Sequence, residues 1–156
     1  HAPKLADRIP MAQFLGLVTS TENTYFLRSF EALEVSKEDQ NAPAAPATRA
    51  FQDLMHTART SGCYEQMLAV LIVAEWSYLT WADRYKSYSV DLPFWFSEWI
   101  DLHTGEGFEN IVAHLRDQLD NAWVEIDDGR RSKAAAMFND AVSCEVAFFD
   151  AAFEVR

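Results

Sequence analysis

Three glutamates lie on helical faces that are otherwise apolar, and they are the residues of this chain best suited to acid–base chemistry. Glu22, Glu75 and Glu145 each fall at an i, i+3 or i+4 position within a stripe of apolar residues. A carboxylate among apolar side chains loses hydration, so it needs a partner, a raised pKa or a function. A glutamate at the edge of a stripe could instead keep its carboxylate in water. Three such glutamates in 156 residues favour an acid-lined interior cavity.

The spacing around these glutamates argues against a di-metal carboxylate centre. Such centres in helical bundles use Glu-x-x-His pairs, which offer an oxygen and a nitrogen ligand on one helical turn. The residues three positions after the glutamates are Tyr25, Tyr78 and Phe148. The histidines do not have the mutual spacing of a metal site either; they are His1, His56, His103 and His114. We therefore expect no metal ion and no cofactor.

Aromatic side chains beside the glutamates suit a pocket for a flat organic ring. Tyr78 shares the helical face of Glu75, whereas Trp76 and Trp81 are expected to lie off that face. On a later short helix, Phe96, Trp99 and His103 share a face and could form walls for the ring. Ordinary core packing accounts for most of these aromatic residues equally well, and His103 could be a hydrogen-bonded core histidine.

Helices have to position these groups, because five Gly and five Pro are too few for the frequent turns of an all-β chain. Pro10 suits the first turn of a helix, after an irregular stretch at 1–9. Residues 35–48 are expected to form a linker and residues 127–129 a turn. The helices are expected at about 10–33, 47–60, 62–88, 93–103, 108–123 and 131–154. Short connections between them predict a compact all-α helical bundle.

Each expected helix has an inward apolar face. In the first helix this face is expected to include Leu15 and Leu33. In the fifth it includes Trp123, and in the last it includes Phe149. Glu145 is the best placed of the glutamates, because apolar residues surround it on both adjacent turns.

Charge and hydropathy exclude several classes of protein. The net charge is −11, with 24 acidic against 13 basic residues and no cluster of Lys or Arg, which excludes a surface that follows nucleic-acid phosphates. The longest apolar run, 67–74, is far shorter than the roughly 20 residues of a membrane span, and no signal-peptide pattern precedes it. Cys63 and Cys144 lie within apolar helical patterns, which favours reduced, inert thiols. We expect a cytoplasmic protein.

The chain length predicts a single domain covering residues 1–156. The chain begins without an initiator Met and without a helix-start signal. We therefore expect it to be the downstream part of a longer domain.

Three segments carry a family resemblance. The first, 46–85, opens with Pro-Ala-Thr, continues through Gly-x-Tyr and an apolar run, and contains Val-Ala-Glu-Trp-Ser-Tyr at 73–78. The second, 94–112, contains Trp-Ile followed by an acidic helix start, and the third, 143–153, reads SCEVAFFDAAF. In this order and at this spacing they resemble the TenA family of thiaminase II-like proteins. The resemblance covers about residues 46–153, with a weaker likeness at 11–35.

This resemblance implies an all-α, haem-oxygenase-like fold and a homo-oligomer, a dimer or a tetramer. It also implies hydrolytic release of an amine or a thiazole from an aminopyrimidine, in thiamin salvage. Glu145 matches the general acid/base carboxylate of the family. The family's nucleophilic cysteine falls on Ala74, and the adjacent Glu75 matches the glutamate that replaces it in one branch. The remaining matches are candidate substrate-binding residues: Tyr78, His103, Tyr25 and Trp76.

The resemblance also leaves alternatives open. The family keeps a pyrimidine-binding aspartate in its early helices, and these are expected to have no counterpart here. Either the N-terminal helices are missing from this chain or the site is incomplete. The runner-up functions are a haem-oxygenase-like di-iron or cofactor oxidase of small organic substrates, and a non-catalytic binding protein on the same fold.

Overall fold

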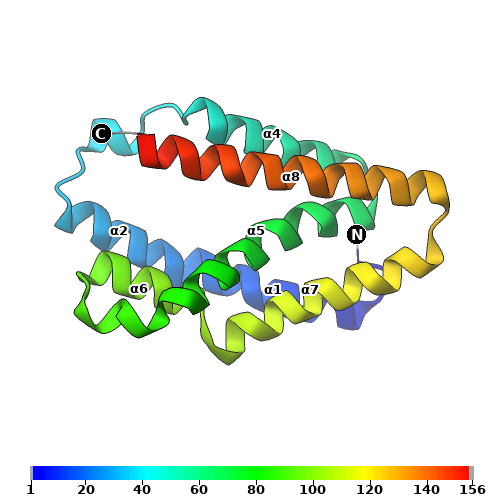
Figure 1. Ribbon diagram of the computed structural model, residues 1–156, viewed down its shortest axis with the longest axis horizontal. Helices are drawn as coiled ribbons and strands as arrows, with labels where there is room; N and C mark the ends of the chain where they lie inside the picture. The colour runs from blue at the N-terminus through cyan, green and yellow to red at the C-terminus, as the bar shows by residue number, and fades with distance from the viewer. Residues whose placement is uncertain (1, 155–156) are drawn as a thin grey trace. The chain divides into compact units, whose positions relative to one another are not determined.

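The computed structural model describes residues 2–154, apart from the side chains of residues 88–90, and every regular element in this part of the chain is helical. The prediction of an all-α fold is therefore confirmed. The elements are α1 (Leu5–Leu17), a π-helical turn (Val18–Glu22), α2 (Asn23–Ala32), α3 (Lys37–Gln40), α4 (Pro46–Thr60), α5 (Tyr64–Tyr85), a 3₁₀ turn (Lys86–Asp91), α6 (Phe94–Leu102), α7 (Gly105–Glu125) and α8 (Asp128–Glu154) (Figure 1). None of the described helices has the length and apolar character that crossing a bilayer requires.

The chain divides into two compact units, which we describe separately. The first unit takes in residues 1–2, 44–77 and 112–156, and the second takes in residues 3–43 and 78–111. The division falls within α5, after Ser77, and within α7, before Val112. The first unit thus contains α4, α8 and parts of α5 and α7, and the second contains α1 to α3, α6 and the remaining parts of α5 and α7.

In the first unit, α4 and α8 lie side by side and run in opposite directions (Figure 1). Pro46 opens α4, where its missing N–H costs no helical hydrogen bond. The helix is followed by Gly62, whose φ of 71° lies in the left-handed region that favours glycine. Ser61 accepts a hydrogen bond from the Cys63 N–H and donates one to the Ala58 carbonyl, which fixes the connection from α4 to α5. The buried apolar residues of this unit are Phe51, Ala58, Leu68, Ala69, Val70, Ile72, Val73, Val112, Leu115, Ile126, Ala134 and Ala141.

The last helix starts earlier than the sequence predicts. We expected a turn at 127–129 and a helix from about Arg131, but α8 begins at Asp128. The reason is that the Asp127 carboxylate accepts a hydrogen bond of 2.9 Å from the Arg130 N–H, which satisfies a backbone donor of the first turn. Gly129 lies inside this capped turn rather than ending a loop.

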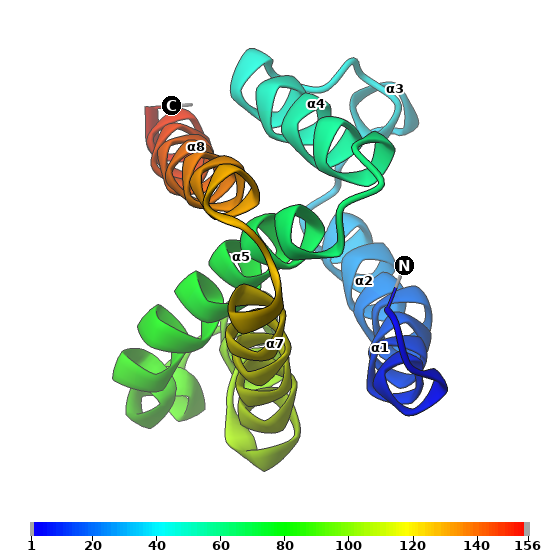
Figure 2. The same cartoon turned by 90° about the vertical axis from the view of Figure 1, so that its right-hand side faces the viewer.

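In the second unit, α2 continues from α1 through the π-helical turn with little change of direction, as both Figure 1 and Figure 2 show. The expectation of an irregular stretch at 1–9 is wrong, because α1 begins at Leu5 and places Pro10 inside the helix; residue 1 lies outside the described residues. A proline removes one helical hydrogen bond without necessarily ending the helix.

The predicted helix at 10–33 is also interrupted, by the turn at 18–22. Short hydroxyl side chains there bond back to carbonyls four residues earlier. Thr19 Oγ1 donates to the Leu15 carbonyl at 2.7 Å, and Ser20 Oγ donates to the Gly16 carbonyl at 2.6 Å. Such bonds compete with the regular backbone ladder and favour a local distortion of the helix.

Two further boundaries differ from expectation. The predicted linker at 35–48 contains the single helical turn α3, because Ser36 caps it by accepting a hydrogen bond of 3.0 Å from the Asp39 N–H. The third predicted helix, expected to run to about residue 88, ends at Tyr85 and continues as a 3₁₀ turn.

Some residues expected on inward faces are exposed. Leu15 is 61% exposed, because the neighbouring Phe14 is the residue of that turn that contacts Phe108. Leu33 is 52% exposed, because it lies just beyond α2 with a non-helical backbone, where the helical periodicity no longer applies. Trp123 and Phe149 are also classed among the exposed large apolar residues, and nothing in the structure explains why.

Candidate active site

Glu145 is the buried acid that the sequence predicts. It lies on α8 in the first unit and is 5% exposed. Neither of its carboxyl oxygens has a hydrogen-bond partner among the described residues. Burial without compensation raises the pKa of Glu145 from the ordinary 4.5 to about 7. This group therefore changes its protonation state near neutral pH.

The face of α8 explains why Glu145 is buried. Ala134, Ala141 and Glu145 are the buried residues of this helix, and they follow one another at intervals of seven and four. Glu145 lies on the same face of α8 as these two alanines, so its whole side chain, including the carboxyl group, is buried. The pKa of Cys144 is also raised, by burial first and then by the negative charges of Asp140 and Glu145, which makes its thiolate less available.

Glu75 and Trp76 lie in the same unit, on α5. Glu75 is half-buried. Because the oxygens of Glu145 have no hydrogen-bond partner among the described residues, Glu75 and Glu145 do not share a proton through a hydrogen bond. Trp76 lies at the surface, where the Arg116 guanidinium covers its ring at 4.2 Å from the ring centroid.

The other predicted substrate-binding residues lie together in the second unit, around Trp99. The ring of Tyr25 stacks on Trp99 at 5.3 Å between centroids, and the ring of Tyr78 meets Trp99 edge-on at 5.8 Å. His103 lies 4.3 Å from Trp99 and 4.7 Å from Tyr78. Three residues from three helical segments, α2, α5 and the end of α6, are thus brought into one aromatic cluster.

His103 has a defined tautomer in this cluster. Its Nδ1 lies 2.7 Å from the Trp99 carbonyl oxygen. Because a carbonyl oxygen can only accept, Nδ1 carries the proton, and Nε2 of the neutral ring is an acceptor. Burial lowers the pKa of His103, although the hydrogen bond to Trp99 acts in the opposite direction. The ring is therefore neutral at physiological pH and able to accept a hydrogen bond.

Tyr25 and Glu22 lie one helical turn apart at the start of α2. The Tyr25 hydroxyl donates a hydrogen bond of 2.7 Å to the Trp95 carbonyl, which connects α2 to α6. Burial raises the pKa of Tyr25. Glu22 closes the π-helical turn and is half-buried, and burial raises its pKa as well. The second unit therefore contains a partly desolvated carboxyl group, that of Glu22, one helical turn before Tyr25 of the aromatic cluster.

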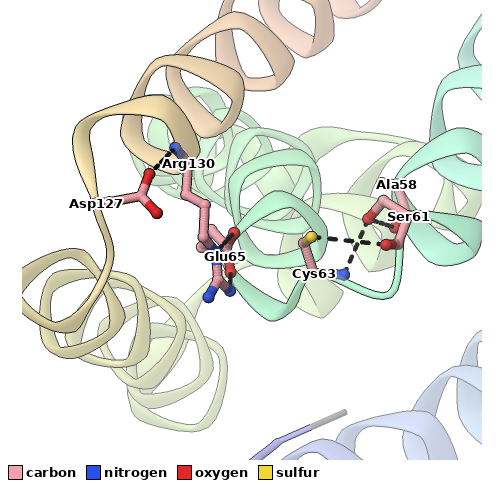
Figure 3. A network of polar contacts seen from close by, with 6 residues as sticks. All are labelled: Ala58, Ser61, Cys63, Glu65, Asp127 and Arg130. Carbon is pink, nitrogen blue, oxygen red and sulfur yellow. Dashed lines mark hydrogen bonds and ion pairs between the residues drawn. The ribbon is translucent and has the colours of Figure 1, made fainter.

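Sequence reasoning missed the most buried acid of the chain. Glu65 lies at the start of α5 and is 1% exposed, and it accepts two hydrogen bonds from Arg130 (Figure 3). Burial acts to raise the pKa of Glu65, but the hydrogen bonds and the charge of Arg130 outweigh it, so the pKa is lowered. An acid in the first turn of a helix is common, so the sequence carried no signal for this pair.

Within the described residues, no three or more His, Cys, Asp or Glu side chains gather as the ligands of a metal ion would.

The comparison with curated proteins gave no match. The TENA/THI-4/PQQC family matches residues 3–155. This match includes residues 3–45, where the sequence showed only a weaker likeness at 11–35. The chain belongs to the TENA/THI-4/PQQC family and has its helical, haem-oxygenase-like fold.

Proposed function

We propose that this protein hydrolyses a C–N bond in an aminopyrimidine or a related thiamin-degradation compound, in thiamin salvage, without a cysteine nucleophile. The observation that carries the proposal is the buried carboxyl group of Glu145, which has no hydrogen-bond partner among the described residues and has a pKa of about 7. A general acid/base works best when its pKa lies near the working pH, because both protonation states are then populated.

In this mechanism the two glutamates divide the proton transfers. The oxygen of a water molecule attacks the carbon that bears the departing nitrogen, and the C–N bond breaks. Glu75 takes a proton from the attacking water, and protonated Glu145 gives its proton to the departing amine. Glu75 is half-buried and lies closer to solvent than Glu145, which makes it the proposed base for the attacking water. Glu145, whose pKa burial raises to about 7, is the proposed acid.

Ala74 supports water as the attacking group. It occupies the position that the family resemblance assigns to a nucleophilic cysteine, and a methyl side chain has no nucleophilic atom. Cys144 is a poor substitute, because its raised pKa reduces the thiolate fraction.

Within the second unit taken by itself, the aromatic cluster is a proposed subsite for a flat heterocyclic ring such as a pyrimidine. Tyr25, Tyr78 and His103 offer flat faces, and Nε2 of His103 is an acceptor for an exocyclic amine. Trp76 remains a proposed substrate contact on the strength of the resemblance alone, since Arg116 covers its ring.

The test is turnover by a Glu145→Gln variant. We expect hydrolysis of amino- and formylamino-pyrimidines to fall by at least about a hundredfold, because the amide keeps the shape of the side chain but cannot transfer the proton. The matched control is Glu154→Gln, the same change at an exposed position of the same helix. Full activity of Glu145→Gln would overturn the assignment.

The same assay separates an enzyme from a binding protein. Aminopyrimidine binding without turnover by the wild type would favour a family member that has lost its chemistry. The homo-oligomeric state and the cytoplasmic location stay predictions. Gel filtration combined with light scattering measures the former, and fractionation of cells measures the latter.

A further inference from the structure

Trp81 joins the aromatic cluster from α5. It lies one helical turn after Tyr78, and the centroids of the two rings are 5.8 Å apart. Its ring centroid is 6.3 Å from that of His103, and the two planes are inclined by 36°. Sequence periodicity placed Trp81 off the inward face of this helix, but α5 buries side chains on more than one face, as Leu68, Ala69 and Val70 show.

The indole N–H of Trp81 is buried and has no acceptor among the described residues. Two other polar groups of the cluster do have partners: the Tyr25 hydroxyl donates to the Trp95 carbonyl, and His103 Nδ1 donates to the Trp99 carbonyl, both at 2.7 Å. A buried donor without a partner is unfavourable and rare in folded proteins. An indole nitrogen can only donate, so what this position lacks is an acceptor atom.

We propose that the Trp81 N–H donates a hydrogen bond to a ring nitrogen of the bound heterocycle, which makes Trp81 a specificity-determining residue. The inference rests on the proposed function, because it takes the aromatic cluster as the subsite for the pyrimidine ring. A site that hydrogen-bonds a particular ligand atom rejects an analogue without that atom, since its own buried group is then left unpaired. Trp81 therefore selects a ring nitrogen over a C–H group at the facing ring position.

The test uses 4-amino-5-hydroxymethyl-2-methylpyrimidine and the two aminopyridines in which either ring nitrogen is replaced by C–H. Calorimetry compares their binding to the wild type, to Trp81→Phe and to Trp123→Phe, a matched change at an exposed tryptophan of the other unit. We expect the wild type and Trp123→Phe to bind the pyrimidine about tenfold more tightly than one of the aminopyridines. Trp81→Phe should bind the pyrimidine about tenfold more weakly and should not distinguish that aminopyridine from it.

A second measurement does not depend on the affinity of the variant. In the ¹⁵N-labelled wild type, the indole N–H resonance of Trp81, assigned from its absence in Trp81→Phe, should move downfield with the pyrimidine. It should not move downfield with the weakly bound aminopyridine.

The outcomes separate this inference from the proposed function. If the pyrimidine binds but the Trp81 resonance does not shift downfield, or Trp81→Phe weakens all three ligands equally, the ring-nitrogen contact is wrong and the proposed function stands. A water molecule would then be the acceptor. If none of the three ligands binds the wild type, the proposed function fails and this inference fails with it.

Discussion

Arg130 donates two hydrogen bonds to the carboxylate of Glu65, from Nε to Oε1 at 2.9 Å and from Nη2 to Oε2 at 2.7 Å (Figure 3). Two parallel bonds fix orientation as well as distance. The contact therefore ties the start of α8 to the start of α5 within the first unit. Because α8 also bears Glu145, this ion pair sets the position of the helix that carries the proposed acid.

The first prediction is that the two halves of this pair are not equivalent. Arg130→Met should lower the urea midpoint of unfolding more than Glu65→Leu does. Arg130→Met leaves a carboxylate that is 1% exposed without its partner, whereas Glu65→Leu leaves a guanidinium that is 47% exposed and can be hydrated. Lys133→Met, at an exposed position one turn further along α8, is the control for losing a positive charge. Equal losses from the two substitutions would show that burial of Glu65 does not determine the stability of this contact.

The second prediction concerns the stability of Glu145→Gln. The folded chain holds the Glu145 proton more tightly than the unfolded chain, because the pKa is about 7 rather than 4.5. The stability contributed by this group is complete below pH 4.5 and is lost as the pH rises through 7. Glu145→Gln should therefore match the wild type at acid pH and exceed it by about 3 kcal/mol at about pH 8.

Denaturant unfolding of both proteins across this pH range measures the difference. Glu154→Gln, at an exposed position, reports any general effect of removing one negative charge. A difference between Glu145→Gln and the wild type that does not grow with pH would mean that Glu145 is paired or hydrated in the folded protein.

Local sequence pattern was enough to predict the helical fold and the burial of Glu145. The alternation of alanine and aromatic residues around that glutamate repeats at helical intervals, and burial of Ala141 and Glu145 follows directly from it. The pattern also placed Phe96, Trp99 and His103 on one face as walls for a ring. The rings of Trp99 and His103 do lie 4.3 Å apart, but Phe96 is 56% exposed.

Features that depend on distant residues could not be predicted in the same way. Glu65 and Arg130 are far apart in sequence. They form an ion pair only because the start of α5 lies beside the first turn of α8. The contact between the rings of Trp81 and His103 likewise joins residues that are far apart in sequence. The helix start at Leu5 was missed because a proline was taken as a boundary, although the backbone accommodates Pro10 inside α1.

The third prediction is that the Tyr25 hydroxyl stabilises the second unit. Tyr25→Phe removes the hydrogen bond from α2 to the Trp95 carbonyl but keeps the ring that stacks on Trp99. We expect a loss of about 1 kcal/mol in the free energy of unfolding. Tyr25→Leu, which also removes the stacked ring, should lose more, by about 1 kcal/mol beyond that. Unchanged stability of Tyr25→Phe would mean that water replaces the hydroxyl at the carbonyl without cost.

The fourth prediction separates His103 from Glu145 by the sign of its pH dependence. Burial lowers the pKa of His103 below 6.5, so the unfolded chain binds this proton more tightly than the folded chain does. The stability that neutral His103 contributes is complete above pH 6.5 and is lost as the pH falls through its lowered pKa. Glutamine is not protonated in this pH range, so the stability of the wild type relative to His103→Gln should decrease as the pH falls below 6.5. In the same range the stability of the wild type relative to Glu145→Gln should increase as the pH falls.

Urea unfolding of the three proteins at each pH measures both trends. If the difference between the wild type and His103→Gln stays constant as the pH falls below 6.5, the imidazole ring is hydrated in the folded protein rather than enclosed by Tyr78 and Trp99.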